Sequence, residues 1–145
     1  MAYKLKFAFA AFGMAFASLV MYVLLHESGH ALVGVLCGAS NIRISIISAH
    51  TSWCGGSFNA ITDSLCHAAG SALPVCISWG AMIFYSKSRK SLVYQMTYVV
   101  FFAVTTVSVL SWVFLPVYSM YAPLPQTDDV TKFLNTSGIS PVLVS

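Results

Sequence analysis

Charged residues are what this sequence has least of, and their scarcity excludes most classes of soluble protein. Asp, Glu, Lys and Arg make up only 8% of the 145 residues, whereas hydrophobic residues make up 58%. Soluble domains contain about 25% charged residues. The net charge of +3 comes from few basic residues that form no stripe, so a nucleic-acid partner is not expected. The composition predicts one domain, residues 1–145, in a multi-pass integral membrane protein surrounded by the lipid bilayer.

Closely spaced cysteine pairs and internal sequence repeats are lacking as well. The four cysteines show no Cys-x-x-Cys spacing, which argues against a cysteine zinc knuckle and against a redox pair. We expect these cysteines to behave as small apolar residues within packed helices. The sequence contains no internal repeat and no low-complexity tract.

Glutamate occurs only once, at Glu27, and this position is the most informative in the chain. It lies in the pattern His-Glu-x-x-His, between His26 and His30. Helix positions four apart differ by about 40° around the axis and roughly 6 Å along it, so both imidazoles can reach one metal ion. Glu27 is rotated about 100° from His26 and can touch a water molecule on that ion without being a ligand. Zinc peptidases divide the work in this way.

A chance origin for this motif is costly. Each ionisable side chain in an apolar membrane helix costs about 3 kcal/mol on insertion scales, and such residues are functional by default. Three of them stand within one turn here. We therefore predict a metal site with His26 and His30 as ligands, Glu27 as the catalytic residue and Zn²⁺ as the cofactor.

Three apolar segments are each long enough to cross a bilayer. They lie at about residues 7–36, 65–85 and 92–115. The first follows basic residues, as in a cleavable signal peptide, but its apolar run is too long and its removal would destroy the His-Glu motif. Thr62, Asp63 and Ser64 are expected to cap the second helix. We predict an all-α integral membrane protein with about three transmembrane helices, a small membrane-surface β-hairpin and a short C-terminal helical segment.

Residues 39–63 predict the hairpin. Residues 42–46 alternate between apolar and polar side chains with β-branched residues, and residues 53–58 indicate a turn and a second short strand. An edge strand can bind an extended peptide by β-addition. This makes Trp53, Gly55 and Gly56 candidate substrate-binding residues. The alternative is an ordinary interfacial loop with Trp53 as its membrane anchor.

A catalytic zinc site needs a third protein ligand besides the paired histidines. Pro123 and Pro125 exclude a regular helix in the segment that contains them. Residues 127–129 then read as the start of a short helix that ends near residues 135–138. We expect one carboxylate of this tail to complete the site. His67, near the start of the second span, is a candidate metal or substrate contact. The available donors are Asp63, Asp128, Asp129, His50 and His67.

These residues resemble the site-2 protease family of intramembrane zinc metalloproteases. The resemblance rests on the motif of residues 26–31, His-Glu-Ser-Gly-His-Ala, at the end of an N-terminal apolar helix. It continues through the small residues 69–71 into the acidic tail. It implies that His26, His30 and an Asp bind zinc while Glu27 activates water. The Asp falls on Asp128 or Asp129, of which Asp129 suits the spacing to Gly138 better.

The sequence departs from the family pattern in two places. Residues 127–130 read Thr-Asp-Asp-Val where the family has Leu-Asp-Gly or Asn-Pro-Asp-Gly. Gly70 is followed by Ser71, with Pro74 displaced, where the family has Gly-Pro and then an Asn. The first departure concerns the third ligand, and the second concerns contacts that clamp the substrate.

The predicted function is hydrolysis of peptide bonds in transmembrane or membrane-proximal protein substrates. One alternative is a non-catalytic metal-binding membrane protein, either an inactive relative or transporter-like, with a site saturated by protein ligands. Another is a structural helix bundle with a fortuitous motif and no metal. The orientation has two readings: basic residues near the N-terminus and at 87–90 favour a cytoplasmic N-terminus, whereas the resemblance implies a metal nearer the cytoplasm.

Overall fold

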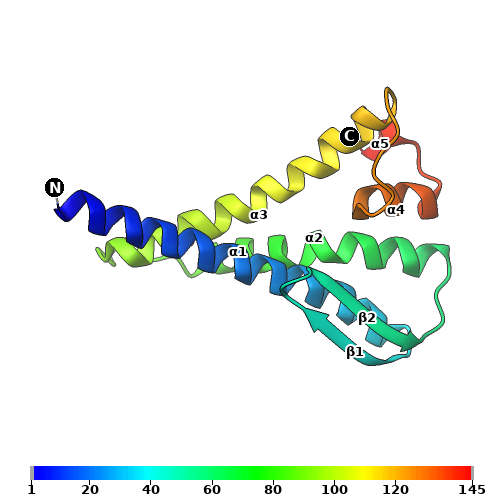
Figure 1. The fold of residues 1–145 in the computed structure, drawn as a ribbon, viewed down its shortest axis with the longest axis horizontal. Coiled ribbons are helices and arrows are strands. Elements are labelled where there is room, and N and C mark those ends of the chain that lie inside the picture. Colours follow the sequence, from blue (N-terminus) through cyan, green and yellow to red (C-terminus); the bar gives the residue numbers. More distant parts are fainter. Residues whose placement is uncertain (1, 145) are drawn as a thin grey trace.

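Figure 1 shows the computed structural model, which describes the backbone of residues 2–144 and the side chains of residues 5–144. Most of the chain is helical, and the sheet has two strands. The elements in chain order are α1 (Ala2–Leu36), β1 (Ala39–Ser45), β2 (His50–Gly55), α2 (Ala60–Ile83), α3 (Leu92–Ser119), α4 (Asp129–Ser137) and α5 (Pro141–Val144).

The three long helices form the body of the molecule. α1 and α2 pack along each other, and α3 contacts both. In Figure 1, α3 diverges from the other two toward its C-terminal end, where α4 and α5 fold back. α4 then packs against α2. The C-terminal segment is thereby brought to the end of α1 that carries the His-Glu motif.

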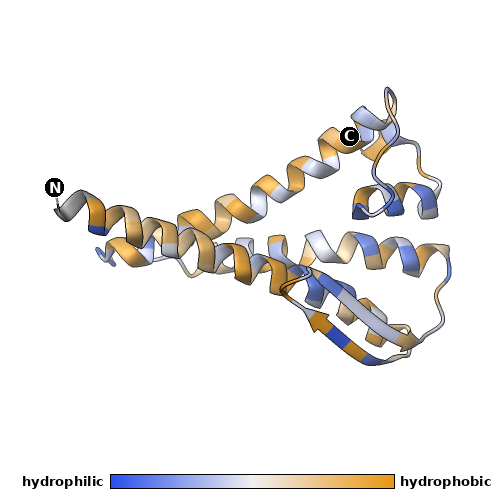
Figure 2. Ribbon diagram, viewed as in Figure 1, coloured by the Kyte–Doolittle hydropathy of each residue, from blue (hydrophilic) through white to orange (hydrophobic). Residues whose placement is uncertain are grey.

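Each long helix has the length and composition of a membrane span. The apolar stretches cover 32 residues in α1 (Leu5–Leu36), 24 in α2 (Ala60–Ile83) and 28 in α3 (Leu92–Ser119). About 20 apolar residues suffice to cross the hydrocarbon core of a bilayer. Figure 2 shows hydrophobic residues along most of α1 and α3, whereas hydrophilic residues gather on α4 and on the neighbouring part of α2.

Burial in this fold is inverted relative to a soluble protein. Large side chains of α1 point outward, among them Phe12, which is 72% exposed. Soluble proteins mostly bury such residues and expose their polar ones. Within residues 5–144, the buried polar side chains outnumber the buried hydrophobic ones and are Ser18, Glu27, His30, Thr51, Ser64, Ser71, Ser78, Thr105 and Thr131. The outer surface therefore suits lipid, and the interior holds the polar groups.

The predicted hairpin is confirmed, although its second strand begins at His50 rather than near Trp53. β1 and β2 are antiparallel, with Ile44 opposite Thr51. A register irregularity follows Ser40. Next to it, Asn41 adopts a φ of 52°, which the short polar side chain of Asn tolerates better than most residues. The hairpin packs against α1, so its second strand faces the helix that carries the motif.

The predicted start of the second helix is wrong. α2 begins at Ala60, not near residue 65, and its N-cap is Asn59 rather than a residue of the 62–64 stretch. The Asn59 side chain accepts hydrogen bonds from the Ile61 and Thr62 amides, and the Thr62 hydroxyl accepts one from the Asn59 amide. This capping box satisfies otherwise unpaired donors of the first turn. α3 likewise continues past the predicted residue 115, through Pro116 to Ser119.

Glycine allows α1 and α2 to approach closely at the motif. A Cβ atom at Gly29 would overlap the carbonyl group of Ala69 and lie 3.0 Å from the Gly70 amide nitrogen. Both neighbours are backbone atoms and cannot rotate away. Small residues permit such close packing of membrane helices. Gly29, which lies between Glu27 and His30 in the motif, therefore sets the spacing between the two helices.

Replacing Gly29 with Ala should lower stability, because the added methyl group collides with the α2 backbone. Overpacking of this kind costs about 1–3 kcal/mol. Gly13→Ala is the matched control, since a Cβ there meets nothing within 4 Å. Thermal unfolding of the purified protein in detergent should show a lower melting temperature for Gly29→Ala only. Equal melting temperatures for both variants and the wild type would contradict the packing described.

Candidate metal centre

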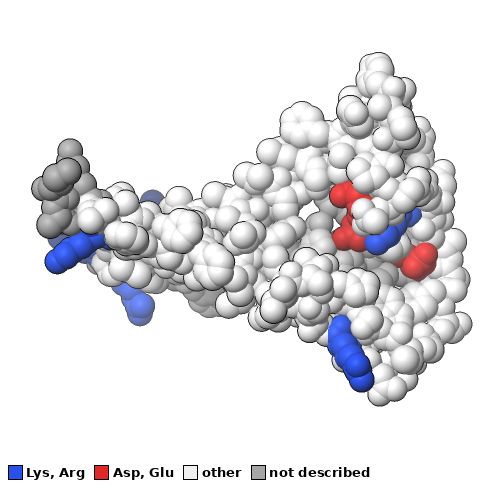
Figure 3. All heavy atoms as spheres, viewed as in Figure 1, with Lys and Arg blue, Asp and Glu red and all other residues white. Residues whose placement is uncertain are grey.

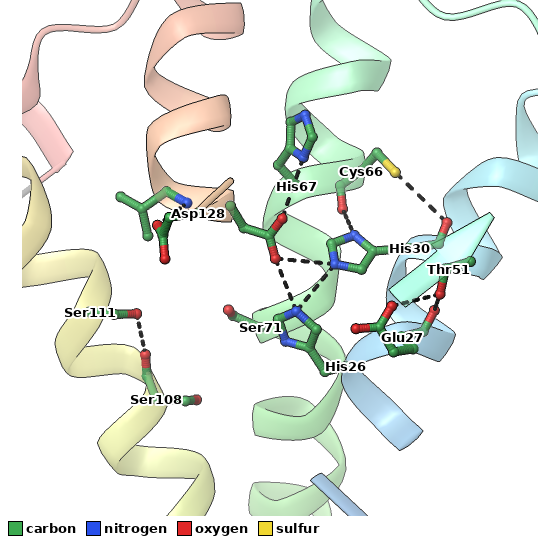
Figure 4. Close-up of polar contacts among 12 residues, drawn as sticks. His26, Glu27, His30, Thr51, Cys66, His67, Ser71, Ser108, Ser111 and Asp128 are labelled. Atoms are coloured by element: carbon green, nitrogen blue, oxygen red, sulfur yellow. Dashed lines mark hydrogen bonds and ion pairs between the residues drawn. The ribbon is translucent and has the colours of Figure 1, made fainter. Parts of the chain in front are cut away.

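Three donor atoms from α1 and α4 converge on one point (Figure 4). The Nε2 atoms of His26 and His30 lie 3.2 Å apart. Oδ2 of Asp129 lies 3.0 Å from the first and 3.2 Å from the second. Ligand atoms around a tetrahedral zinc ion with bonds of about 2.0–2.1 Å are about 3.3 Å apart. The three atoms therefore have the spacing of three ligands of one zinc-sized ion.

The hydrogen bonds of the imidazoles direct their Nε2 atoms to this point. The Cys66 carbonyl can only accept, so His30 Nδ1–H donates to it at 2.7 Å. A neutral His30 then carries its lone pair on Nε2, the arrangement that second-shell carbonyl groups give to metal-binding histidines. Nδ1 of His26 lies 3.4 Å from the Tyr22 hydroxyl. Two imidazole lone pairs beside a carboxylate oxygen form a donor set that fits a divalent cation.

Asp129 and Asp128 have different tasks. Asp128 is the N-cap of α4, and its side chain accepts a hydrogen bond from the Val130 amide at 2.9 Å. Asp129 is the first residue of α4, and its side chain reaches the paired histidines. A step of one residue turns a helix by about 100°, so the two neighbouring carboxylates point in different directions.

The Asp129 carboxyl is ionised by its surroundings. Burial by itself raises its pKa, but hydrogen bonds with His26, His30 and His67 outweigh burial and hold the pKa well below its usual range. Nδ1 of His67 lies 3.6 Å from Oδ1, the oxygen that does not face the other two histidines. Asp129 is therefore a carboxylate at neutral pH, which is the form that binds a metal ion.

Glu27 lies beside the three donors but is held by a different partner. Its side chain is only 4% exposed, and Oε2 accepts a hydrogen bond of 2.7 Å from the Thr51 hydroxyl on β2. Figure 4 shows the other carboxylate oxygen directed toward the two imidazoles. Donor atoms of His26, Glu27 and His30 lie within 4.8 Å of one another and could themselves hold a metal ion. The shorter distances favour Asp129 as the third donor and leave Glu27 free to act on water.

The donors face a cavity of about 750 Å³. Its walls come from α1, the hairpin, α2 and the start of α4. Lys132 of α4 is one of the lining residues. In Figure 3, the visible Asp and Glu atoms lie at the wide end of the molecule, whereas most Lys and Arg side chains lie at the narrow end. The cavity can admit an extended segment of another chain.

A second, smaller cavity of about 300 Å³ reaches His26 and Asp129 from the side of α3. Hydroxyl groups of Tyr22, Ser71, Ser108 and Ser111 are among its lining, and Figure 4 shows the α3 serines facing the centre. The cavity is polar although α3 is otherwise largely apolar. It therefore suits water molecules.

The remaining predicted site residues have separate positions. His67, His50 and Trp53 line the larger cavity, and Trp53 also stacks on Phe58 with ring centroids 5.7 Å apart. Gly55 and Gly56 are not among the residues that line it. Their φ angles of 68° and 92° lie in the left-handed region that glycine adopts readily. The positive φ angles favour glycine at both positions, and their role in substrate binding stays a prediction.

Sequence reasoning did not single out Thr51 or the Cys66 carbonyl, and it named Gly70 only as one of the small residues 69–71 of the second helix. A Cβ atom at Gly70 would lie 2.5 Å from His30 Nε2 and 2.9 Å from His26 Cε1. Gly70 therefore leaves the space that both imidazole rings occupy. The run of small residues at 69–71 was the only signal for it. No spacing rule connects Thr51 or Cys66 with a motif on another element.

Asp129→Asn should remove most metal affinity, because the amide oxygen carries no charge and the site loses its anionic ligand. The loss should exceed the about 10- to 100-fold that removal of an outer-shell partner costs. Asp128→Asn is the matched control and should bind zinc like the wild type, because Asn and Asp are equally good N-caps. Zinc titration of the metal-free protein, followed by calorimetry, checks both. Equal affinity of the two variants would contradict the assignment of Asp129.

Comparison of the chain with protein-family models, curated proteins and solved structures finds no match.

Proposed function

We propose that this protein is an intramembrane zinc metallopeptidase that hydrolyses peptide bonds of transmembrane or membrane-proximal protein substrates. The observation that carries the proposal is the convergence of His26, His30 and Asp129 beside the Glu27 carboxylate at the wall of a large cavity. We further propose that the chain is a member of the site-2 protease family, on the resemblance of its motif, its small-residue second helix and its acidic tail.

The outer surface supports the membrane setting. Three helices are long and apolar enough to cross a bilayer, and their large hydrophobic side chains point outward. Most Lys and Arg side chains lie at one end of the molecule, with Asp and Glu at the other (Figure 3). This distribution is compatible with a membrane setting in which most charges lie toward the two surfaces.

The donor set supports zinc as the cofactor. Two imidazole nitrogens and one carboxylate oxygen are the usual protein ligands of zinc in peptidases. When bound, zinc polarises the scissile carbonyl group and makes a neighbouring water molecule easier to deprotonate. The polar cavity lined by hydroxyl groups on the α3 side provides space for that water within an otherwise apolar structure.

Glu27 performs the proton transfers of the proposed reaction. Its free carboxylate oxygen takes one proton from a water molecule while the water oxygen bonds to the carbonyl carbon of the substrate. The bond between that carbon and the peptide nitrogen then breaks. Glu27 returns the proton to the departing amine, so that water is divided between the new carboxyl and amino groups.

A metal-binding protein without catalysis is the second candidate. It requires a fourth protein ligand, and His67 and His50 both line the cavity. The geometry favours catalysis instead, because His67 contacts the outer oxygen of Asp129 at 3.6 Å. X-ray absorption spectroscopy of the zinc-loaded protein tests whether a third histidine is recruited: the proposed catalytic site has two imidazoles plus oxygen donors, whereas saturation by His67 or His50 gives three imidazoles.

Glu27→Gln should abolish most cleavage while zinc binding is retained, because the amide cannot accept the proton. Loss of a general base lowers rates by about 10²- to 10⁴-fold. The measurement uses proteoliposomes that contain the purified protein and a panel of tagged single-pass membrane peptides, with fragments identified by mass spectrometry. Asp128→Asn serves as a carboxylate-removal control and should cleave normally. Undiminished cleavage by Glu27→Gln would refute the proposed role.

Removal of the metal should stop cleavage reversibly. After treatment with 1,10-phenanthroline and dialysis, the protein should be inactive, and stoichiometric Zn²⁺ should restore activity whereas Mg²⁺ should not. The reason is the donor set, since imidazole nitrogens favour zinc and magnesium requires oxygen ligands. Cleavage that persists in protein shown to be metal-free by elemental analysis would exclude the proposed chemistry.

A further inference from the structure

We propose that Thr51 is a positioning residue for Glu27, so that one hydroxyl group of the β-hairpin helps to aim the proposed catalytic base. The inference rests on the proposed function, because it concerns how the Glu27 carboxylate is aimed. It assigns a task to a residue on another element, 24 positions along the chain from Glu27.

The contact itself is short and buried. Thr51 Oγ1 lies 2.7 Å from Glu27 Oε2 and 3.0 Å from the Glu27 main-chain oxygen. Thr51 is 7% exposed and Glu27 is 4% exposed. The hydroxyl has one proton, and the carboxylate oxygen is both the nearer acceptor and the charged one, so it receives the proton. Among the described residues, no other side chain forms a hydrogen bond with this carboxylate.

The hydrogen bond fixes which carboxylate oxygen does the chemistry. Because Thr51 holds Oε2, the carboxylate is oriented with its other oxygen toward the imidazoles (Figure 4), where that oxygen can accept a proton from water. Without the hydroxyl, the side chain of Glu27 can rotate about its terminal bonds, where torsional preferences are broad. Hydrolysis depends on near-attack geometry, so this rotation lowers the fraction of productive arrangements.

The same strand lines the space for the substrate. Ser48, Ala49, His50 and Trp53 line the larger cavity together with Thr51. Trp53 packs close to Gly34 of α1 and against Phe58, which holds the hairpin on the helix that carries Glu27. A peptide that lies along this wall contacts the strand whose hydroxyl aims the carboxylate. Strand β2 thus both lines the space for the proposed substrate and orients the Glu27 carboxylate.

The kinetic test uses Thr51→Val, which keeps the shape of the side chain and removes the donor. The expected result is a fall in kcat of about 10- to 100-fold, the range for loss of an outer-shell partner, with KM and zinc content unchanged. Thr51→Ser restores the hydroxyl and should restore kcat. Ser52→Val places the same side chain on the neighbouring exposed position of β2 and should behave like the wild type. If the Thr51→Val protein does not fold, the Thr51→Ala variant is measured in its place.

A second readout does not depend on cleavage. Glu27 is the only glutamate in the chain, so protein labelled with ¹³C at the glutamate carboxyl reports on this group alone. Isotope-edited infrared spectra should show a shifted carboxylate stretch in Thr51→Val and the wild-type band in Thr51→Ser and Ser52→Val. Zinc-loaded and zinc-free samples should both show the shift, because the hydrogen bond does not involve the metal ligands directly.

The outcomes separate this inference from the proposed function. An unchanged infrared band, an unchanged kcat in folded Thr51→Val, or loss of activity that Thr51→Ser does not rescue would each overturn the role of Thr51 while wild-type cleavage stands. Absence of any Glu27-dependent cleavage by the wild type would overturn the proposed function and, with it, the positioning role. A shifted band with a Ser-rescued fall in kcat supports the inference.

Discussion

The attraction between one carboxylate and two imidazoles joins the distant parts of this chain. Asp129 meets His26 across 103 positions of sequence. A carboxylate taken out of water requires charged or hydrogen-bonding partners, and Asp129 finds three of them, all imidazoles, on α1 and α2. This requirement accounts for the return of α4 onto α2 after α3 has diverged. The other polar contacts of the centre form around this one: Cys66 orients His30, and His67 supports the outer oxygen of Asp129.

The interior of the bundle is organised by hydroxyl groups rather than by large apolar side chains. The Thr105 hydroxyl donates to Ser78 at 2.8 Å, and the indole N–H of Trp112 donates to Ser71 at 2.9 Å. Such contacts join side chains of α3 to small polar residues of α2. In lipid there is little hydrophobic force between helices, so close packing and interhelical hydrogen bonds have to hold them together. The same kind of hydroxyl group lines the smaller cavity beside His26 and Asp129.

The elements of the fold could be predicted from the sequence because their signals are local. Long apolar runs marked the three helices, alternation of side chains marked the hairpin, and the Asp128-Asp129 pair before Gly138 marked α4. The start of α2 could not be placed, because the capping box at Asn59 lies in a stretch that reads equally well as a loop.

The pairing of His26 with His30 follows from helical periodicity. The choice between Asp128 and Asp129, and the contact of Thr51 with Glu27, depend on how separate elements dock, which no local pattern records.

The length of α1 has a consequence for the depth of the centre. Its apolar stretch of 32 residues is about 48 Å long at 1.5 Å per residue, whereas the hydrocarbon core measures about 30 Å. In the proposed membrane setting this excess has to be relieved by helix tilt or by local thickening of the bilayer. His26 and His30 stand near the far end of α1, so any change in tilt moves them along the membrane normal. Hydrophobic mismatch thus relates bilayer thickness to the level at which the proposed spanning substrate would meet the candidate metal ligands.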